Sequence, residues 1–353
     1  MTMLKDVKVW VGLIVSVISF YFFNRQVQEF TSWGDVFQTV LSVSYILFIP
    51  SILLNFVSVY FRALRWRSFL GEPHEPTGRL FALMCICFMG NSVLPARAGE
   101  LIRTFVLARK GQRRFTEVLA TVVVERFFDF AGILIGLGAV LLIAPPRIEE
   151  QSNLQLIIKT GGKASVVFVV GAAAVLLFLT YLPEWSRGIV EWITRPLPEK
   201  IWGRPLRRKI LEMTVSFERG LSTFRRPASL VWTAFLTLLV WLLLGWSEYV
   251  MIQAFGMSGT ISFMGAILIM VAICLAVALP SAPGYVGIYH LAAQAVLIEL
   301  YHIPADKASA FAIVLWLSQI VPLIIAGLVS LNRMNITFRE IVHVQEEAQP
   351  EES

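Results

Sequence analysis

The 353-residue chain is 57% hydrophobic and only 15% charged, whereas soluble domains are nearer half apolar and a quarter charged. This composition excludes a soluble globular domain and a disordered chain, and the three cysteines, all in apolar runs, exclude a disulfide-built secreted module. Apolar stretches of about 18 residues or more indicate an all-α polytopic membrane protein instead. The net charge of +6 is therefore interpreted as a topology signal.

Six uninterrupted apolar segments are predicted to cross the membrane as helices, because lipid offers no partner to an unpaired backbone group. These segments are 8–23, 39–61, 117–144, 162–182, 229–254 and 309–331. No small-residue cleavage site follows Phe23. The first segment is therefore interpreted as a retained span rather than as a signal peptide.

Two further apolar regions, 80–108 and 261–300, are interrupted by proline and glycine. A proline removes a helical hydrogen bond, and a glycine permits the reversal that follows. The residues predicted to break the two regions are Pro95, Gly99, Pro280, Pro283 and Gly284. We predict two re-entrant helical hairpins and hence eight membrane segments, although the second region is also long enough for two short tilted spans.

The basic residues are distributed unevenly over this topology. With both hairpins returning to their own side, 24 Lys and Arg residues fall on one side and five on the other. An excess of Lys and Arg marks the cytoplasmic side, so both termini are predicted to be cytoplasmic in an inner-membrane protein. Loop 183–228 is predicted to be cytoplasmic, with an amphipathic helix over 206–224, and the acidic tail 332–353 is predicted to be disordered.

The two breaks share the pattern Leu-Pro-x-x-x-Gly, at 94–99 and at 279–284. Each break follows two predicted spans and precedes one. The unit of two spans, a hairpin and a third span therefore occurs twice, and it crosses the membrane an odd number of times. Such a unit must repeat upside down, which predicts an inverted repeat with halves 1–144 and 162–331. A chance match between two common membrane-helix motifs is the alternative.

Three ionisable residues, Glu125, Arg126 and Asp129, lie within the predicted span 117–144. Charges at membrane depth cost several kcal/mol unless they are paired or face water. One arginine cannot neutralise two carboxylates, so a second cation is expected nearby, with Arg97 or Arg103 as the candidates. The cluster is either an ion-pair lock that only fixes the fold or a lock that also binds substrate.

The first hairpin carries Asn91, Arg97, Glu100 and Arg103. Arginine forks and free backbone N–H groups suit a phosphate, so these residues are predicted to bind the headgroup of an anionic lipid. The alternative is that the arginines anchor the hairpin at the interface. The segment 62–67, with three arginines around Trp66, is also expected at the inner interface.

The second hairpin carries Tyr285, Tyr289 and His290, whose spacing is interpreted as one helical face lining an outer vestibule. Interfacial or core aromatic packing is the alternative. Glu248 is a further buried acid, with a role in proton coupling or in polar packing.

No catalytic motif is recognised, and the four histidines have no metal-ligand spacing. The sequence therefore predicts neither a metal nor a cofactor and no nucleic-acid partner. Whether the chain forms homo-oligomers is left open.

Four motifs occur in order: RALRWRSFLG at 62–71, GNSVLPARAGELIR at 90–103, VVVERFFD at 122–129 and LPSAPGYVGIYH at 279–290. Together they resemble the lysylphosphatidylglycerol synthase transmembrane-region family, the flippase-like domains of UPF0104-type membrane proteins. The resemblance implies translocation of an anionic phospholipid or of a polyprenyl-phosphate-linked lipid. It does not imply aminoacyl transfer, which in that family belongs to a separate soluble domain.

Two other functions are kept open. One is a membrane transferase that uses Glu100, Glu125 or Asp129 as a base on a lipid-linked substrate. The other is a protein that presents lipid to a separate lipid-synthesising enzyme.

Overall fold

The computed structural model describes residues 7–71, 75–94, 98–144, 181–194, 227–279 and 283–336, with a few single positions between 167 and 215. The described residues form helices and connecting turns without strands. The helices are α1 (Val7–Phe30), α2 (Trp33–Leu41), α3 (Phe48–Leu70), α4 (Thr77–Val93), α5 (Gly99–Lys110), α6 (Phe115–Ile143), α8 (Pro183–Thr194), α10 (Pro227–Ala254), α11 (Phe263–Ala278), α12 (Ile288–Tyr301) and α13 (Ala305–Arg333).

Four of the described helices are long and apolar enough to cross a membrane. They cover Tyr45–Leu70, Phe115–Ile143, Ala228–Ala254 and Ala305–Arg333. The last three coincide with predicted spans. The predicted span 8–23 lies within the single helix α1, whereas 162–182 and most of 206–224 fall outside the described residues.

The predicted span 39–61 is wrong in its boundaries. The chain turns after α2 ends at Leu41, and α3 then continues nine residues beyond position 61, as far as Leu70. Arg62 and Arg65 were expected to end this span at the interface, but they are buried inside the helix. The apolar helix can continue past them because carboxylates on α6 neutralise their charge.

Both interrupted regions consist of two helices separated by a break, as predicted. In each region the two helices pack together, α4 with α5 and α11 with α12. The first pair approaches closely because both facing residues are glycines: a Cβ atom added to Gly90 would lie 2.8 Å from the Cα of Gly99. Residues 95–97 and 280–282 of the breaks lie outside the described part of the chain. In the second break, Gly284 adopts φ +73°, a conformation that favours glycine.

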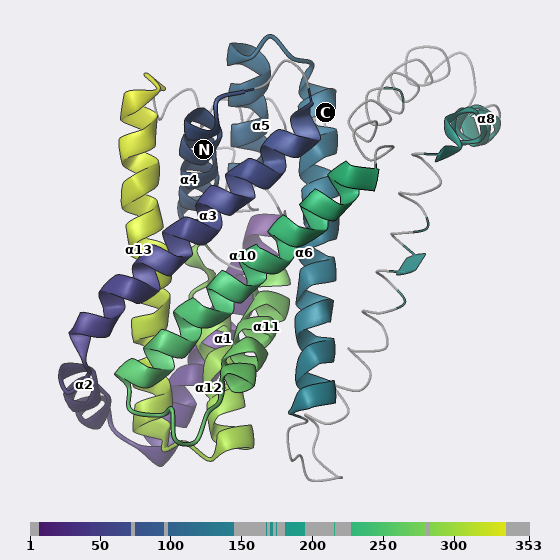
Figure 1. Ribbon diagram of the computed structural model, residues 1–353. Helices are drawn as coiled ribbons and strands as arrows, with labels where there is room; N and C mark the ends of the chain where they lie inside the picture. Colours follow the sequence, from purple (N-terminus) through teal and green to yellow (C-terminus); the bar gives the residue numbers. More distant parts are fainter. Residues whose placement is uncertain are drawn as a thin grey trace.

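The two helix pairs lie at opposite ends of the molecule, α4 and α5 at the top of Figure 1 and α11 and α12 at the bottom. Their breaks meet in the interior, where the short helix η6 (Pro283–Tyr285) packs on α4. A Cβ atom at Gly284 would lie 3.5 Å from the carbonyl oxygen of Ser92. The Trp316 indole holds this junction by donating a 2.7 Å hydrogen bond to the Gly284 carbonyl.

The longer helices surround this junction in matched contacts. α3 and α10 run side by side in opposite directions across the middle of Figure 1. α4 packs on α13, and α11 packs correspondingly on α6. Two apolar cores result, one around α3, α4 and α5 and the other around α11, α12 and α13.

Candidate functional site

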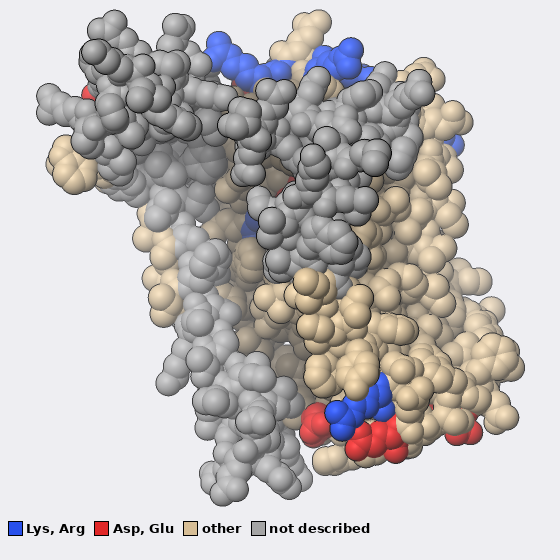
Figure 2. Space-filling view, turned by 180° about the vertical axis from the view of Figure 1, so that it is seen from behind, with Lys and Arg blue, Asp and Glu red and all other residues tan. Residues whose placement is uncertain are grey.

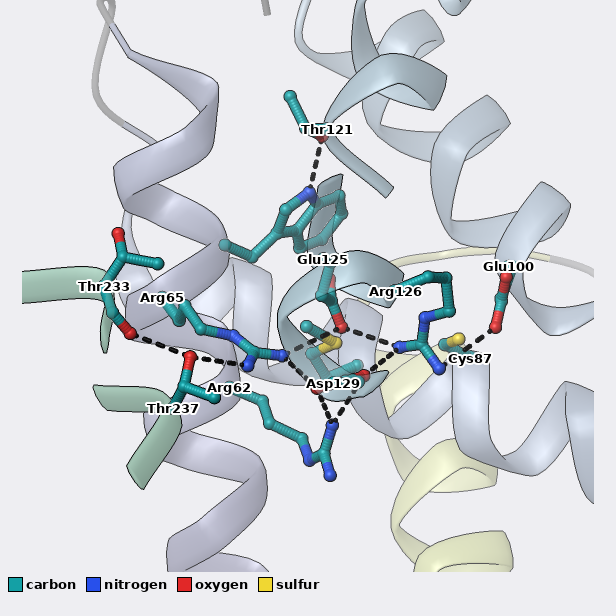
Figure 3. Close-up of polar contacts among 12 residues, drawn as sticks. Arg62, Arg65, Cys87, Glu100, Thr121, Glu125, Arg126, Asp129, Thr233 and Thr237 are labelled. Atoms are coloured by element: carbon teal, nitrogen blue, oxygen red, sulfur yellow. Dashed lines mark hydrogen bonds and ion pairs between the residues drawn. The ribbon is translucent and has the colours of Figure 1, made fainter. Parts of the chain in front are cut away.

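Seven charged side chains from three helices meet next to the first break, in the interior of the bundle. All of them except Arg103 are labelled in Figure 3. We call these seven residues the buried charge cluster. They are Arg62 and Arg65 from α3, Glu100 and Arg103 from α5, and Glu125, Arg126 and Asp129 from α6.

Asp129 is held by three arginines. Arg62 Nη1 donates to both carboxylate oxygens, at 3.0 and 3.1 Å. Arg65 Nη2 lies 2.5 Å from Oδ1, and Arg126 Nη2 lies 2.9 Å from Oδ2. This number of ionic contacts explains how a carboxylate is kept in the interior of an apolar helix.

Glu125 faces the first hairpin. Its Oε2 lies 2.9 Å from Arg103 Nη1, and its Oε1 accepts a 2.9 Å hydrogen bond from Arg126. The Arg103 guanidinium also lies over the Trp66 ring, 4.6 Å from the centroid, which adds a cation–π contact. The predicted pairing of Arg103 with the α6 carboxylates is therefore present, and the side chain of Arg103 is fully enclosed.

Arg126 and Glu100 form the accessible side of the cluster. Their side chains are 34% and 22% exposed, whereas those of the other five members are at most 9% exposed. Arg126 Nη1 lies 3.4 Å from Glu100 Oε1, the loosest contact that Arg126 makes in the cluster. An incoming anion would meet these two side chains first.

The cluster carries more positive than negative charge. Its four arginines face three carboxylates, which leaves one surplus positive charge. Among its N–H groups, Arg65 Nε, Arg126 Nε and both Nε and Nη2 of Arg103 have no hydrogen-bond partner in the described part of the chain. Unpaired buried donors are costly, and together with the surplus charge they form a site suited to an additional anion.

Polar and aromatic side chains enclose the cluster. Thr237 on α10 accepts a 3.0 Å hydrogen bond from Arg65, and Thr121 accepts one of 2.9 Å from the Trp66 indole. The Trp241 ring lies 5.7 Å from the Arg62 guanidinium carbon. It reaches this position because Gly132 has no side chain: a Cβ atom there would lie 1.9 Å from Trp241 Nε1.

The other residues predicted for the first hairpin are only partly placed. Asn91 is buried at the end of α4 against Gly99, and its side-chain oxygen has no partner among the described residues. Arg97, predicted to contact the phosphate directly, and Pro95 lie outside the described residues.

The three residues predicted for an outer vestibule do not share one helical face. Tyr285 lies in η6, and the chain turns at Gly287 (φ +88°) before α12 begins, so only Tyr289 and His290 belong to the helix. Both are buried. The His290 ring packs between Phe23 and Trp316, with centroid distances of 5.3 and 5.5 Å. This surrounding corresponds to the alternative of aromatic packing.

Glu248 is buried in α10, and its Oε2 has no hydrogen-bond partner among the described residues. The two halves therefore differ: the first contains a dense set of ion pairs, whereas Glu248 in the second forms no ion pair with any residue that the structure describes.

Arg62 and Arg65 are functional candidates that the sequence analysis placed wrongly. Their spacing of three puts them on one face of a helix, and the two carboxylates of α6 needed more than one cation. These two signals together could have identified them. They were missed because arginines beside a tryptophan at the end of an apolar run are also typical of an interfacial anchor.

The arrangement is better suited to binding an anion than to proton transfer. Glu125 and Asp129 each contact at least two guanidinium groups, which stabilise the ionised carboxylate and oppose its protonation. A general base needs the opposite, a carboxylate free to accept a proton. Glu100 makes a single ionic contact in the cluster, at 3.4 Å from Arg126.

Comparison with known proteins identifies the family. The family model for the lysylphosphatidylglycerol synthase TM region matches residues 9–327. The chain is 24% identical to a UPF0104 membrane protein of Methanothermobacter thermautotrophicus, over 85% of this chain and 88% of the relative. It is 22% identical to the glycosyltransferase AglD of Haloferax volcanii, over 99% of this chain but only 58% of AglD. No solved structure matches the chain. The chain therefore belongs to the lysylphosphatidylglycerol synthase transmembrane-region family of membrane proteins.

Proposed function

We propose that this protein translocates an anionic or phosphate-bearing lipid across the inner membrane, and that the buried charge cluster binds the lipid phosphate. The single observation that carries the proposal is the surplus positive charge of the cluster as a whole, four arginines against three carboxylates, in a cluster whose accessible arginine is Arg126. A phosphate can replace Glu100 at the Arg126 guanidinium and form the bidentate contact that this group favours. Among the predicted contacts, Arg97 and Asn91 would complete the site from the first hairpin.

The distribution of exposed charge supports the orientation that we propose. The basic end of the molecule is the end where α3, α5 and α13 finish and α4 and α6 begin, at the top of Figures 1 and 2. Its charged residues include Arg67, Arg79, Arg109, Lys110, Arg113, Arg114 and Arg333, with Glu75 and Glu117. The opposite end shows acidic and basic side chains together in Figure 2. An excess of Lys and Arg marks the cytoplasmic side of a membrane protein. The basic end would therefore be cytoplasmic, and both termini would lie on the same side.

Two inverted halves would provide alternating access. The contacts α4–α13 and α11–α6, and the antiparallel pair α3–α10, are those expected of two copies of one unit related by a two-fold axis in the membrane plane. In this proposal α4–α5 enters from the cytoplasm and α11–α12 from outside. Opening one pair while the other closes at the Ser92–Gly284 junction would pass the headgroup between the leaflets.

The test is a translocation assay in proteoliposomes. Fluorescent phosphatidylglycerol is incorporated, and the fraction accessible to a membrane-impermeant quencher is followed over time. Arg126→Gln removes the surplus charge and leaves three arginines facing three carboxylates. Because Arg126 also contacts Glu125 and Asp129, the unfolding temperature of the variant is measured together with its transport. We expect translocation to fall at least tenfold in this variant, with Arg126→Lys retaining more activity. Lys307→Gln, at the opposite end, is the matched control and should transport normally.

Arg97→Ala tests the contribution of the first break in the same assay and is expected to abolish translocation in a folded protein. Wild-type rates in both Arg126→Gln and Arg97→Ala would contradict the proposed headgroup site. A wild-type protein that moves no lipid would contradict the function itself.

A membrane transferase acting on a lipid-linked substrate is the second candidate, favoured by the similarity to AglD and by the accessibility of Glu100. Incubation of the pure protein with a labelled lipid distinguishes the two functions. Covalent change of the lipid, detected by mass spectrometry, supports the transferase, and relocation of unchanged lipid supports translocation. Activity that returns only when a co-purifying enzyme is added would support lipid presentation.

A further inference from the structure

A pocket of about 570 Å³ opens at the basic end, between the first turns of α4 and the last turns of α13. It lies apart from the buried charge cluster, because none of the seven cluster residues lines it. The pocket is therefore a second candidate site, with its own chemistry.

The pocket arises from the way α4 and α13 pack. Nearer the middle of the bundle the two helices touch at Gly327, where an added Cβ atom would lie 2.4 Å from the Cβ of Met89. Toward the basic end the lining includes Phe81 and Ala82 on α4 and Ala326 and Val329 on α13, and the pocket lies between the two helices. It is therefore a groove between α4 and α13 near the basic end of the bundle.

The groove has an apolar wall and a basic rim. Phe81, Ala82 and Val329 supply the wall. The rim is formed by Arg79 from α4, Lys110 from the last turn of α5 and Arg333 from the last turn of α13. The consecutive helices α4 and α5 and the distant helix α13 thus each contribute one basic side chain to the same opening.

The basic rim is only partly neutralised. Arg79 Nη1 lies 2.9 Å from Glu75 Oε2, and Lys110 donates a hydrogen bond to the main-chain carbonyl of Met334. Arg333 is exposed and forms no ion pair within the described ranges. Three cations therefore face one carboxylate, which leaves two surplus positive charges beside an apolar wall.

We propose that this groove binds an anionic phospholipid, with the phosphate at Arg79, Lys110 and Arg333 and one acyl chain along the wall of Phe81, Ala82 and Val329. Basic pockets between membrane helices suit anionic headgroups because phosphate receives both charge and hydrogen bonds there. Inorganic phosphate shares this chemistry but gains nothing from the apolar wall, so the groove favours the lipid. This site does not depend on the proposed transport, and either can fail without the other.

The test is a lipid titration of the full-length protein in detergent micelles, read by native mass spectrometry. Phosphatidylglycerol and phosphatidylcholine of identical acyl chains are compared. Each surface Lys or Arg contributes roughly a factor of five to binding of an anionic lipid. The double variant Arg79→Gln/Arg333→Gln is therefore expected to bind phosphatidylglycerol about 25-fold more weakly, with phosphatidylcholine unaffected. The matched control is Arg25→Gln/Lys307→Gln, which removes two cations from the opposite end and should bind normally.

Ala82→Trp distinguishes binding of a lipid from binding of free phosphate, because the larger side chain fills the groove and every charge stays in place. We expect it to weaken phosphatidylglycerol binding at least tenfold, and we expect inorganic phosphate to compete poorly. Wild-type binding by Ala82→Trp, together with effective competition by phosphate, would overturn the proposal in favour of a phosphate site. Unchanged binding by the double variant would overturn it as well.

The acidic tail is the other possible occupant of the basic rim, and a third variant tests it. Its glutamates 340, 346, 347, 351 and 352 are replaced by glutamine in the full chain. Unchanged affinity for phosphatidylglycerol is expected. A tenfold gain would show that the tail occupies the rim and would overturn the proposal. Unfolding temperatures of all variants are measured, and Arg333→Gln alone, at an exposed helix end, replaces the double variant if that variant does not fold.

Discussion

The Arg65 guanidinium on α3 and the Asp129 carboxylate on α6 meet in the interior of the bundle, with 2.5 Å between Nη2 and Oδ1. Their side chains are 0% and 9% exposed. Because both groups are almost completely withdrawn from water, each is stabilised in its charged form by the opposite charge beside it. The pair therefore fixes α3 against α6, and α5 is held beside them by the contact of Arg103 with Glu125.

Removing one partner of this network is expected to destabilise the protein strongly. Asp129→Asn leaves Arg62, Arg65 and Arg126 with one carboxylate fewer, and breaking a buried ion pair in this way costs about 3–5 kcal/mol. The free energy of unfolding in mixed micelles measures the effect. Glu29→Gln is the control, since it removes an exposed pair with Arg25 and should cost less than about 1 kcal/mol. Equal losses in the two variants would contradict the structural role of Asp129.

Glu100 is expected to weaken anion binding, because it contacts the Arg126 guanidinium at the accessible side of the cluster. Glu100→Gln raises the surplus from one positive charge to two. We expect it to increase the affinity of a short-chain phosphatidylglycerol roughly fivefold and to steepen the salt dependence of binding. Calorimetric titration at two salt concentrations measures both quantities. A decrease in affinity would indicate instead that Glu100 itself contacts the ligand.

The contact between α4 and α5 requires glycine at position 99. A Cβ atom there would lie 1.9 Å from the carbonyl oxygen of Cys87 and 2.7 Å from Asn91 Oδ1. Gly99→Ala is therefore expected to lower stability by about 1–3 kcal/mol or more, through overpacking. Gly138→Ala on α6 is the control, because no atom lies within 4 Å of its added Cβ, and alanine favours a helix by up to about 1 kcal/mol. Thermal unfolding in detergent should move in opposite directions for the two variants.

The junction of the two breaks predicts a cross-link. Cysteines introduced at Ser92 and Gly284 should be joined by a short bifunctional maleimide in a chain whose native Cys85, Cys87 and Cys274 are replaced by alanine. The cross-link would hold both helix pairs together, so translocation should stop and should resume after cleavage of a cleavable linker. A cysteine at position 307 is the control partner for position 92. It lies nine residues before Trp316, about 13 Å along α13, and should remain unlinked.

Much of the architecture follows from the linear pattern of residues. Apolar length predicts the helices around 117–144, 229–254 and 309–331, and prolines with glycines predict where 80–108 and 261–300 divide. The same pattern identifies Glu125, Arg126 and Asp129 as groups that require partners, because a charge in an apolar helix is too costly to remain unpaired. It also offers Arg97 and Arg103 as candidate partners, and the structure pairs Arg103 with Glu125. These features can be predicted because they depend on residues close in the sequence. In addition, the bilayer interior requires apolar helices and paired charges whatever the fold.

The tertiary structure decides which residues meet. The sequence alone presents Arg62 and Arg65 as an interfacial anchor, and only the packing of α3 against α6 places them within the membrane helix and on Asp129. Likewise, the spacing of Tyr285, Tyr289 and His290 suggests one face until the turn at Gly287 separates the first from the others. The cost of a buried charge depends on its neighbours in space, which come from distant helices, so only the folded chain could determine where the span ends and which arginines the cluster contains.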